Sequence, residues 1–110
     1  FTGDAGIEAI HDLLNKLPKN INVLKVPHHG AAGVLDKPIL TYLNPECALV
    51  SVGENKFGHP NPYTMSLISP YKIYRTDINN SVRIVANGKD YTVTTYDINK
   101  RKYIQKKVLR

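Results

Sequence analysis

The sequence predicts an α/β fold, in which short strands and helices alternate and then give way to antiparallel strands. Short strand-like segments at residues 22–26, 47–52 and 72–75 are separated by segments whose apolar residues recur at helical spacing. After residue 80, two strand-like runs flank an Asn-Gly pair, which is typical of a hairpin. With 110 residues, the chain is long enough for one small domain and too short for two.

Apolar periodicity and terminator residues place the helices. Residues 7–17 carry apolar side chains every three or four positions, which predicts a helix that Pro18 ends. Asp4 or Gly6 stands where a capping residue is expected. A second helix is predicted for residues 36–43, with an aspartate as its cap and an Asn-Pro pair after its end.

The middle of the chain alternates between a buried strand, a loop and a short helix. The continuous apolar run at 47–52 is typical of a strand that is covered on both faces. Residues 53–62 are rich in Gly, Asn and Pro and predict a loop, and residues 63–68 predict one or two helical turns. Together with the later strands, this order predicts a mixed sheet with flanking helices.

A C-terminal antiparallel meander is predicted for the last third of the chain. Residues 82–86 and 91–96 form a hairpin on an expected type I′ turn at Asn87-Gly88. Residues 101–108 read as an edge strand whose lysines discourage pairing with another sheet.

The basic charge of the chain lies at one end. The net charge is +6, and residues 100–110 hold six basic residues and no acidic one, so residues 1–99 are neutral. A solvated terminal strand is the favoured interpretation, and binding of nucleic acid or anionic lipid by charge is the alternative. The lone Cys47 excludes an internal disulfide, and no apolar run is long enough for a membrane helix. We expect one partial domain, residues 1–110, with a basic tail at 100–110.

Candidate functional residues follow the predicted strands. Asp4, the pair His28-His29, and His59 lie in three loops at the edge of the sheet where ligands bind in open α/β folds. Asp4 alone is interpreted first as a helix cap and alternatively as a carboxylate that bridges two cations. For the His28-His29 pair, metal ligation and ordinary loop polarity are equally favoured. His11, in the middle of a helix, is interpreted as a surface residue.

The loop around His59 offers further polar groups. His59 is either a turn residue or a catalytic group, acting as a general acid or contacting a substrate phosphate. Ser51 and Asn55 flank the same loop and are candidate substrate-binding donors to an anion. Arg75 and Asp77, after the next strand, are interpreted as a structural pair or a turn.

Four segments, in this order and spacing, resemble the metallo-β-lactamase-like domain of ComEC-type competence DNA-uptake proteins and their stand-alone relatives. The resemblance covers about residues 1–86. The segments are Phe1-Thr2-Gly3-Asp4, Leu24-Lys25-Val26-Pro27-His28-His29-Gly30, Ser51-Val52-Gly53-Glu54-Asn55-Lys56-Phe57-Gly58-His59-Pro60 and Tyr74-Arg75-Thr76-Asp77.

The resemblance implies a four-layer αβ/βα sandwich with two divalent metal ions, usually zinc or manganese. Asp4 matches the aspartate that bridges the ions, and the His28-His29 pair matches a histidine ligand of the second ion, with His29 preferred. The nucleophile is a bridging hydroxide, activated because the cations lower the pKa of bound water. Substrates in the superfamily are esters, including phosphodiesters, and the expected task in the competence branch is cutting one DNA strand during uptake.

One motif of the family is absent from this sequence. The principal His-x-His-x-Asp-His metal loop would lie upstream of Asp4, so we expect this chain to be the C-terminal half of the sandwich with an incomplete metal site. Alone, it is expected to be inactive and to bind metal weakly. Its partners would be the N-terminal half and, through a sheet face left exposed, a second copy.

Other functions remain open at this stage. One alternative is a module that binds nucleic acid or an anionic surface through the tail at 100–110. Another is a stand-alone extracellular ester hydrolase of the same superfamily, and a third is a degenerate relative kept for structure. A competence-type parent would be bacterial and either membrane-tethered or extracellular.

Overall fold

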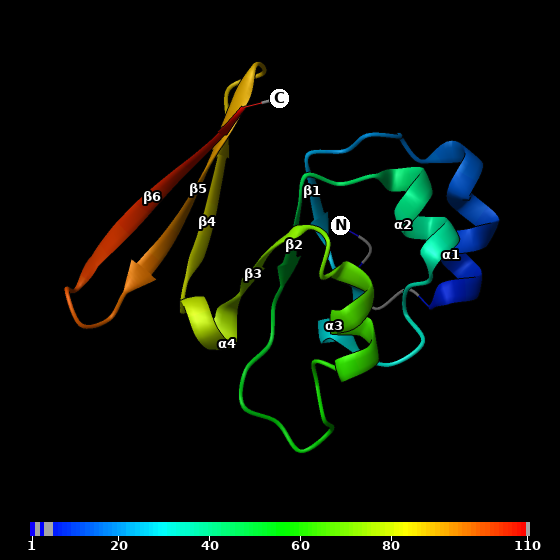
Figure 1. The fold of residues 1–110 in the computed structure, drawn as a ribbon, viewed down its shortest axis with the longest axis horizontal. Coiled ribbons are helices and arrows are strands. Elements are labelled where there is room, and N and C mark those ends of the chain that lie inside the picture. The colour runs from blue at the N-terminus through cyan, green and yellow to red at the C-terminus, as the bar shows by residue number, and fades with distance from the viewer. Residues whose placement is uncertain (2, 4–5, 110) are drawn as a thin grey trace.

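Three layers of secondary structure make up the fold, as Figure 1 shows: helices, a parallel sheet and an antiparallel sheet. The computed structural model describes residues 1, 3 and 6–109, with side chains described up to residue 104. The elements are α1 (Ile7–Leu13), β1 (Val23–Lys25), α2 (Lys37–Leu43), β2 (Cys47–Val50), α3 (Pro62–Ile68), β3 (Lys72–Arg75), α4 (Thr76–Asn79), β4 (Val82–Ala86), β5 (Asp90–Asp97) and β6 (Lys102–Leu109). The α/β class predicted from the sequence is confirmed.

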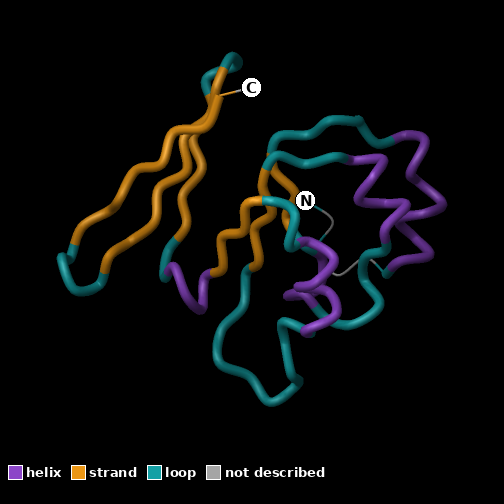
Figure 2. Tube along the Cα trace, in the orientation of Figure 1, coloured by secondary structure: helices purple, strands orange, loops and turns teal. Residues whose placement is uncertain are grey.

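The first sheet is parallel, in the order β1-β2-β3. Val23 pairs with Cys47, and Ala48 pairs with Ile73. Each strand in this sheet is followed by the loop or helix that returns the chain to the start of the next strand, so all three strands end at the same edge. Figure 2 shows loops gathered at that edge, below the strands.

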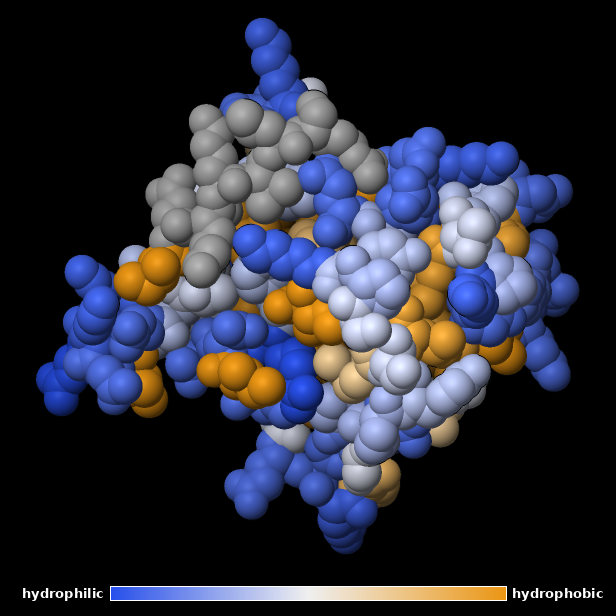
Figure 3. Space-filling model, viewed as in Figure 1, coloured by the Kyte–Doolittle hydropathy of each residue, from blue (hydrophilic) through white to orange (hydrophobic). Residues whose placement is uncertain are grey.

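Helices cover one face of the parallel sheet. Because successive side chains of a strand point to opposite faces, alternate residues of β1 and β2 face the helices and the others face away. The buried residues on the helical side are Ile10, Leu24, Val26, Ala31, Val34, Leu35, Ile39, Leu40, Leu43, Ala48, Val50, Val52 and Ile68. In Figure 3, hydrophobic residues are visible in the middle of the view, with hydrophilic residues around them.

The antiparallel sheet, in the order β4-β5-β6, covers the other face of the parallel sheet. The strands therefore form two separate sheets of three strands each. Side chains of both sheets meet in a second core, formed by Val23, Cys47, Leu49, Tyr74, Val82, Ile84, Tyr91 and Val93. The sequence predicts a face of the parallel sheet left exposed for a second copy; among the described strands, the antiparallel sheet packs against that face. Self-association itself stays a prediction.

The hairpin turn is displaced by one residue from its predicted position. The Asn87 N–H donates to the Asp90 carbonyl at 3.1 Å, so Gly88 and Lys89 are the central residues of the turn. Gly88 has φ +91°, and glycine at the first central position is the type II′ pattern rather than the predicted type I′. The Asn87 side chain instead accepts from the N–H groups of Lys89 and Asp90, each at 2.9 Å. Asn87 therefore stabilises the turn from the position before its two central residues.

The helix caps match the sequence signals. Gly6 is the N-cap of α1, and Asp36 is the N-cap of α2, where its Oδ1 accepts from the Ile39 N–H at 3.0 Å. His11 is exposed, as expected, but it also contacts the cap, with Nε2 2.6 Å from Oδ2 of Asp36. Burial opposes ionisation of Asp36, but the bonds from Ile39 and His11 and the charge of His11 together lower the pKa of that carboxyl.

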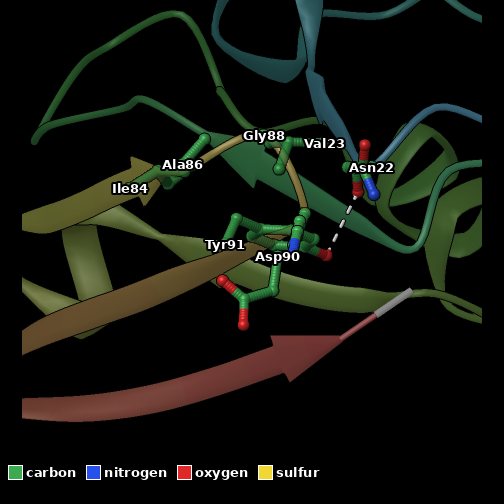
Figure 4. Close-up of a pocket in the computed structure, with 8 residues that line it drawn as sticks. Asn22, Val23, Ile84, Ala86, Gly88, Asp90 and Tyr91 are labelled. Atoms are coloured by element: carbon green, nitrogen blue, oxygen red, sulfur yellow. Dashed lines mark hydrogen bonds between the residues drawn. The ribbon is translucent and has the colours of Figure 1, made fainter.

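A cleft of about 350 Å³ opens between the two sheets at the end where β1 begins (Figure 4). In it, the Tyr91 hydroxyl donates to the Asn22 carbonyl at 3.4 Å, and the same hydroxyl lies 3.8 Å from Sγ of Cys47. This cleft lies at the opposite end of the strands from His28 and His29. Among the described helices, none has the length and apolar character that crossing a lipid bilayer requires.

Candidate functional site

Three histidines meet at the edge of the parallel sheet where β1 and β2 end. The ring centroids of His28 and His59 are 5.7 Å apart, those of His28 and His29 are 6.3 Å apart, and those of His29 and His59 are 6.4 Å apart. His28 and His29 come from the turn after β1, and His59 comes from the long loop between β2 and α3, at the bottom of Figure 1. The folding of two loops thus brings together the three imidazoles that the sequence singled out.

A left-handed turn presents His28 and His29. Their φ angles are +49° and +56°, and Gly30, which follows, has φ +77°. Two successive non-glycine residues in this region are uncommon, and such conformations persist where the surrounding structure holds them. The His28 N–H donates to the Gly3 carbonyl at 2.9 Å, which is one such restraint. The two adjacent rings are inclined at 73°, so they face in different directions.

Gly30 allows the two loops to approach each other. A Cβ atom on Gly30 would lie 2.8 Å from Cβ of Pro60. The Asn61 N–H also donates to the Gly30 carbonyl at 2.7 Å, which joins the histidine turn to the start of α3. A side chain at position 30 would therefore force the histidine turn and Pro60 to shift relative to each other.

His29 is oriented by a main-chain group. Its Nδ1 lies 2.7 Å from the Ser51 carbonyl oxygen, at the end of β2. A carbonyl can only accept, so Nδ1 carries the proton and donates it, and in the neutral imidazole the lone pair is then on Nε2. This is the arrangement by which metal-binding histidines are commonly fixed. Ser51, a predicted substrate-binding residue, thus enters the site through its carbonyl oxygen.

Asn55 holds the loop that carries His59. Its Nδ2 donates to the carbonyls of Gly53 and His59, both at 2.9 Å. Its Oδ1 accepts from the N–H groups of Phe57 at 3.0 Å and of His59 at 3.1 Å. Both hydrogens of the amide are used within the loop, which gives Asn55 a positioning role; its donation to an anion stays a prediction.

The loop and the histidine turn border a small, half-open cavity of about 200 Å³. It is lined by His29, Val52, Gly53, Glu54, Asn55, Phe57 and His59. Within the part of the chain that the structure describes, no three His, Cys, Asp or Glu side chains are grouped so as to hold a metal ion. Asp4, the predicted bridging ligand, lies outside the described residues.

The segment after β3 supports the end of β2. The Thr76 hydroxyl accepts from the Val52 N–H and donates to the Val52 carbonyl, each at 2.8 Å. The sequence interpretation did not assign this role, because it depends on a contact between residues that are far apart in the chain. A threonine directly after a predicted strand is the only signal that pointed to it.

Arg75 and Asp77 form a structural pair, as predicted. The guanidinium donates to the carboxylate through Nε at 3.0 Å and Nη2 at 2.7 Å. This bonding lowers the pKa of Asp77 and raises the pKa of Arg75. The pair closes the turn into α4 and does not line the histidine cavity.

Comparison with known proteins finds sequence similarity to one curated protein. No protein-family model matches the sequence, and no solved structure matches it. Over 100 aligned residues, which cover 87% of this chain, it is 29% identical to ComE operon protein 3 of Bacillus subtilis (strain 168). The chain spans 13% of the length of that relative. The described chain is thus a mixed α/β unit with three clustered imidazoles, and it is similar to one segment of ComE operon protein 3.

Proposed function

We propose that this chain forms part of a metal-dependent hydrolase of the metallo-β-lactamase superfamily, one that cleaves phosphodiesters in competence DNA uptake. The observation that carries the proposal is the orientation of His29 by the Ser51 carbonyl, beside His28 and His59. Similarity to ComE operon protein 3 supports the link to competence. The four sequence segments described above support the choice of superfamily.

The described residues fit a divalent metal ion in part. His29 offers Nε2 with its tautomer already fixed, and zinc and manganese accept imidazole ligands. His29 and the carboxylate of Asp4 would hold the metal. The bound ions would lower the pKa of a water molecule and so supply hydroxide as the nucleophile. Among the described residues no three donors are grouped to hold a metal ion, and the His-x-His-x-Asp-His loop is absent from the sequence, so we expect these 110 residues to be inactive on their own.

His59 is assigned to the leaving group or to the phosphate. In phosphodiester hydrolysis, oxygen from water bonds to phosphorus, one P–O ester bond breaks, and the departing oxygen takes a proton. His59 lines the same cavity as His29 and would donate that proton or bind a phosphate oxygen. Asn55 fixes the backbone on both sides of His59 and so would keep its imidazole in place.

The decisive experiment uses the full-length natural protein that contains these residues. His29→Ala should lower bound zinc or manganese, measured by elemental analysis, and abolish cleavage of a phosphodiester. His59→Ala should retain the metal and lower kcat by about 10²- to 10⁴-fold, as expected for loss of a general acid. His11→Ala, on the outer surface of α1, is the matched control and should change neither. Normal metal content and turnover in His29→Ala would refute the proposal.

The basic tail favours a second candidate function, the binding of nucleic acid through charge. Lys100, Arg101 and Lys102 are exposed around the turn from β5 into β6. If this is the function, changing the three to glutamine should weaken DNA binding at every sequence and reduce its salt dependence, while His29→Ala should leave binding unchanged. Under the hydrolase proposal, the triple substitution should not reduce cleavage of a small phosphodiester whose substituents carry no charge.

A further inference from the structure

Phe57 is held in place and yet left open to solvent beside the histidines. Its ring stacks on that of His59, with centroids 5.7 Å apart and planes inclined by 26°. Phe57 is 72% exposed, although phenylalanine is a residue that folding usually buries. It lines the same cavity as His29 and His59. An aromatic ring thus stands at the rim of the candidate site.

The backbone of Phe57 is fixed on both sides. Asn55 Oδ1 accepts from the N–H groups of Phe57 and His59, and Asn55 Nδ2 donates to the carbonyls of Gly53 and His59. The exposed ring is therefore a preorganised flat apolar surface rather than a side chain on a loose loop. When a planar ligand stacks on this ring, the protein loses little conformational entropy, because the loop is already ordered.

We propose that Phe57 is a stacking platform for a nucleobase, which makes an unpaired nucleic-acid strand the substrate class of this site. This inference rests on the proposed function and specifies its substrate. Every base has a face that stacks on an aromatic ring, while the bases of a duplex are already stacked on each other. Lys56, the preceding residue, is an exposed cation that would attract the adjoining phosphate, and the imidazoles of His29 and His59 line the same cavity as the ring.

The test compares two labelled strands of equal length and equal charge. One is a short thymidine strand, and in the other every nucleotide is abasic. Affinities are measured by fluorescence anisotropy on the full-length protein, with EDTA present so that the strands stay intact. Phe57→Ala should weaken binding of the thymidine strand by about 5- to 150-fold, the range of one lost base–aromatic stack. Binding of the abasic strand should not change.

Two further variants and one control sharpen the result. Phe57→Trp should retain the preference for the thymidine strand, while Phe57→Leu, which is apolar but not aromatic, should lose it as Phe57→Ala does. Tyr63→Ala removes another exposed aromatic, 68% exposed on α3 and outside the cavity, and should affect neither strand. Equal weakening of both strands by Phe57→Ala, or no weakening of either, would overturn the proposal.

Failure of this inference can be told apart from failure of the proposed function. Hydrolysis of a phosphodiester without aromatic groups reports the metal-dependent activity alone. If that diester is cleaved and Phe57→Ala binds both strands as the natural protein does, the stacking role is wrong and the hydrolase stands. If the diester is not cleaved and the preference for bases disappears in Phe57→Ala, the hydrolase is wrong and the stacking role stands.

Discussion

Gly30 shows how one backbone position sets the distance between the two loops of the candidate site. Its positive φ disfavours any side chain, and a Cβ would approach Cβ of Pro60 to 2.8 Å. Gly33 has a similar φ of +70° but nothing within 4 Å of its added Cβ. The two glycines therefore share the conformational restriction and differ in the contact.

This difference predicts unequal effects of Gly→Ala. Gly33→Ala should lower the free energy of unfolding by about 1–2 kcal/mol, from the left-handed backbone alone. Gly30→Ala should lower it by about 2–5 kcal/mol, because overpacking against Pro60 adds to the same restriction. Urea unfolding of both variants measures this. Equal losses would show that the loops can separate freely at Pro60.

Asn55 fixes the loop that carries His59, as Gly30 fixes its distance from the histidine turn. The bonds that the Asn55 amide oxygen accepts can be tested separately. Asn55→Ala should accelerate hydrogen exchange of the Phe57 and His59 amides by about 2- to 12-fold each, the equivalent of one hydrogen bond of 0.5–1.5 kcal/mol. Asn55→Asp keeps an acceptor at that position and should retain most of the protection. The Tyr63 amide, which donates to Asn61 at 2.9 Å, is the internal control. Faster exchange of all three amides would indicate general unfolding instead.

At the scale of the element, the stability of α2 depends on the ionisation of its N-cap, Asp36. The lowered pKa of Asp36 means that ionised Asp36 is stabilised in the folded state. Because the folded-state pKa lies below the ordinary value of 3.8, this contribution is present above pH 3.8 and is lost as the pH falls through the folded-state pKa. The helix should therefore loosen in acid before the interior of the sheet does.

Asp36→Asn isolates this contribution. The amide still caps α2 but cannot ionise or form an ion pair with His11, so the cost at neutral pH should be below about 1 kcal/mol. Acidification below pH 3.8 should shrink the difference in unfolding free energy between the natural protein and Asp36→Asn. The Arg75–Asp77 pair titrates in both proteins and cancels from the difference. A difference that stays constant with pH would contradict the assignment.

At the scale of the whole molecule, the two sheets are joined by an apolar core that Val93 fills. Val93→Ala should lower the free energy of unfolding by about 2–3 kcal/mol, from lost burial and the resulting cavity, because Val93 is fully buried. Val85→Ala, on the opposite face of the same sheet and 48% exposed, should change it by no more than about 0.5 kcal/mol.

Cys47 reports separation of the sheets directly. It is 1% exposed in the core between them, and burial raises the pKa of its thiol. Labelling with a thiol reagent should be slow in the natural protein and faster in Val93→Ala, but not in Val85→Ala. Rapid labelling of the natural protein would show that the sheets separate easily.

Much of the fold could be predicted from the sequence, because apolar runs and capping residues act locally. The strands at 72–75 and 82–86, the cap at Asp36 and the Arg75–Asp77 pair are confirmed. The hairpin turn was misplaced by one residue because Asn87-Gly88 and Gly88-Lys89 both satisfy turn preferences, and only the strand register decides between them.

The sequence singled out three histidines of the candidate site, but it did not predict how they are arranged. The sequence marked His28, His29 and His59, but the 2.7 Å contact of His29 with Ser51 joins residues 22 positions apart. The stacking of Phe57 on His59 likewise depends on how Asn55 closes the loop. Such contacts follow from packing between loops, which local preferences do not encode. The role of Asp4 stays a prediction.

The three imidazoles are all attached at one end of the parallel sheet. They lie beyond one set of strand ends, while the connections at residues 17–22 and 44–46 lie at the other set. Insertions in those connections would lengthen the protein without moving the three imidazoles, since the parallel sheet lies between the two sets of strand ends. Length variation among natural homologues, and tags or fused domains added by engineers, should accordingly be tolerated at the far rim and selected against near the imidazoles.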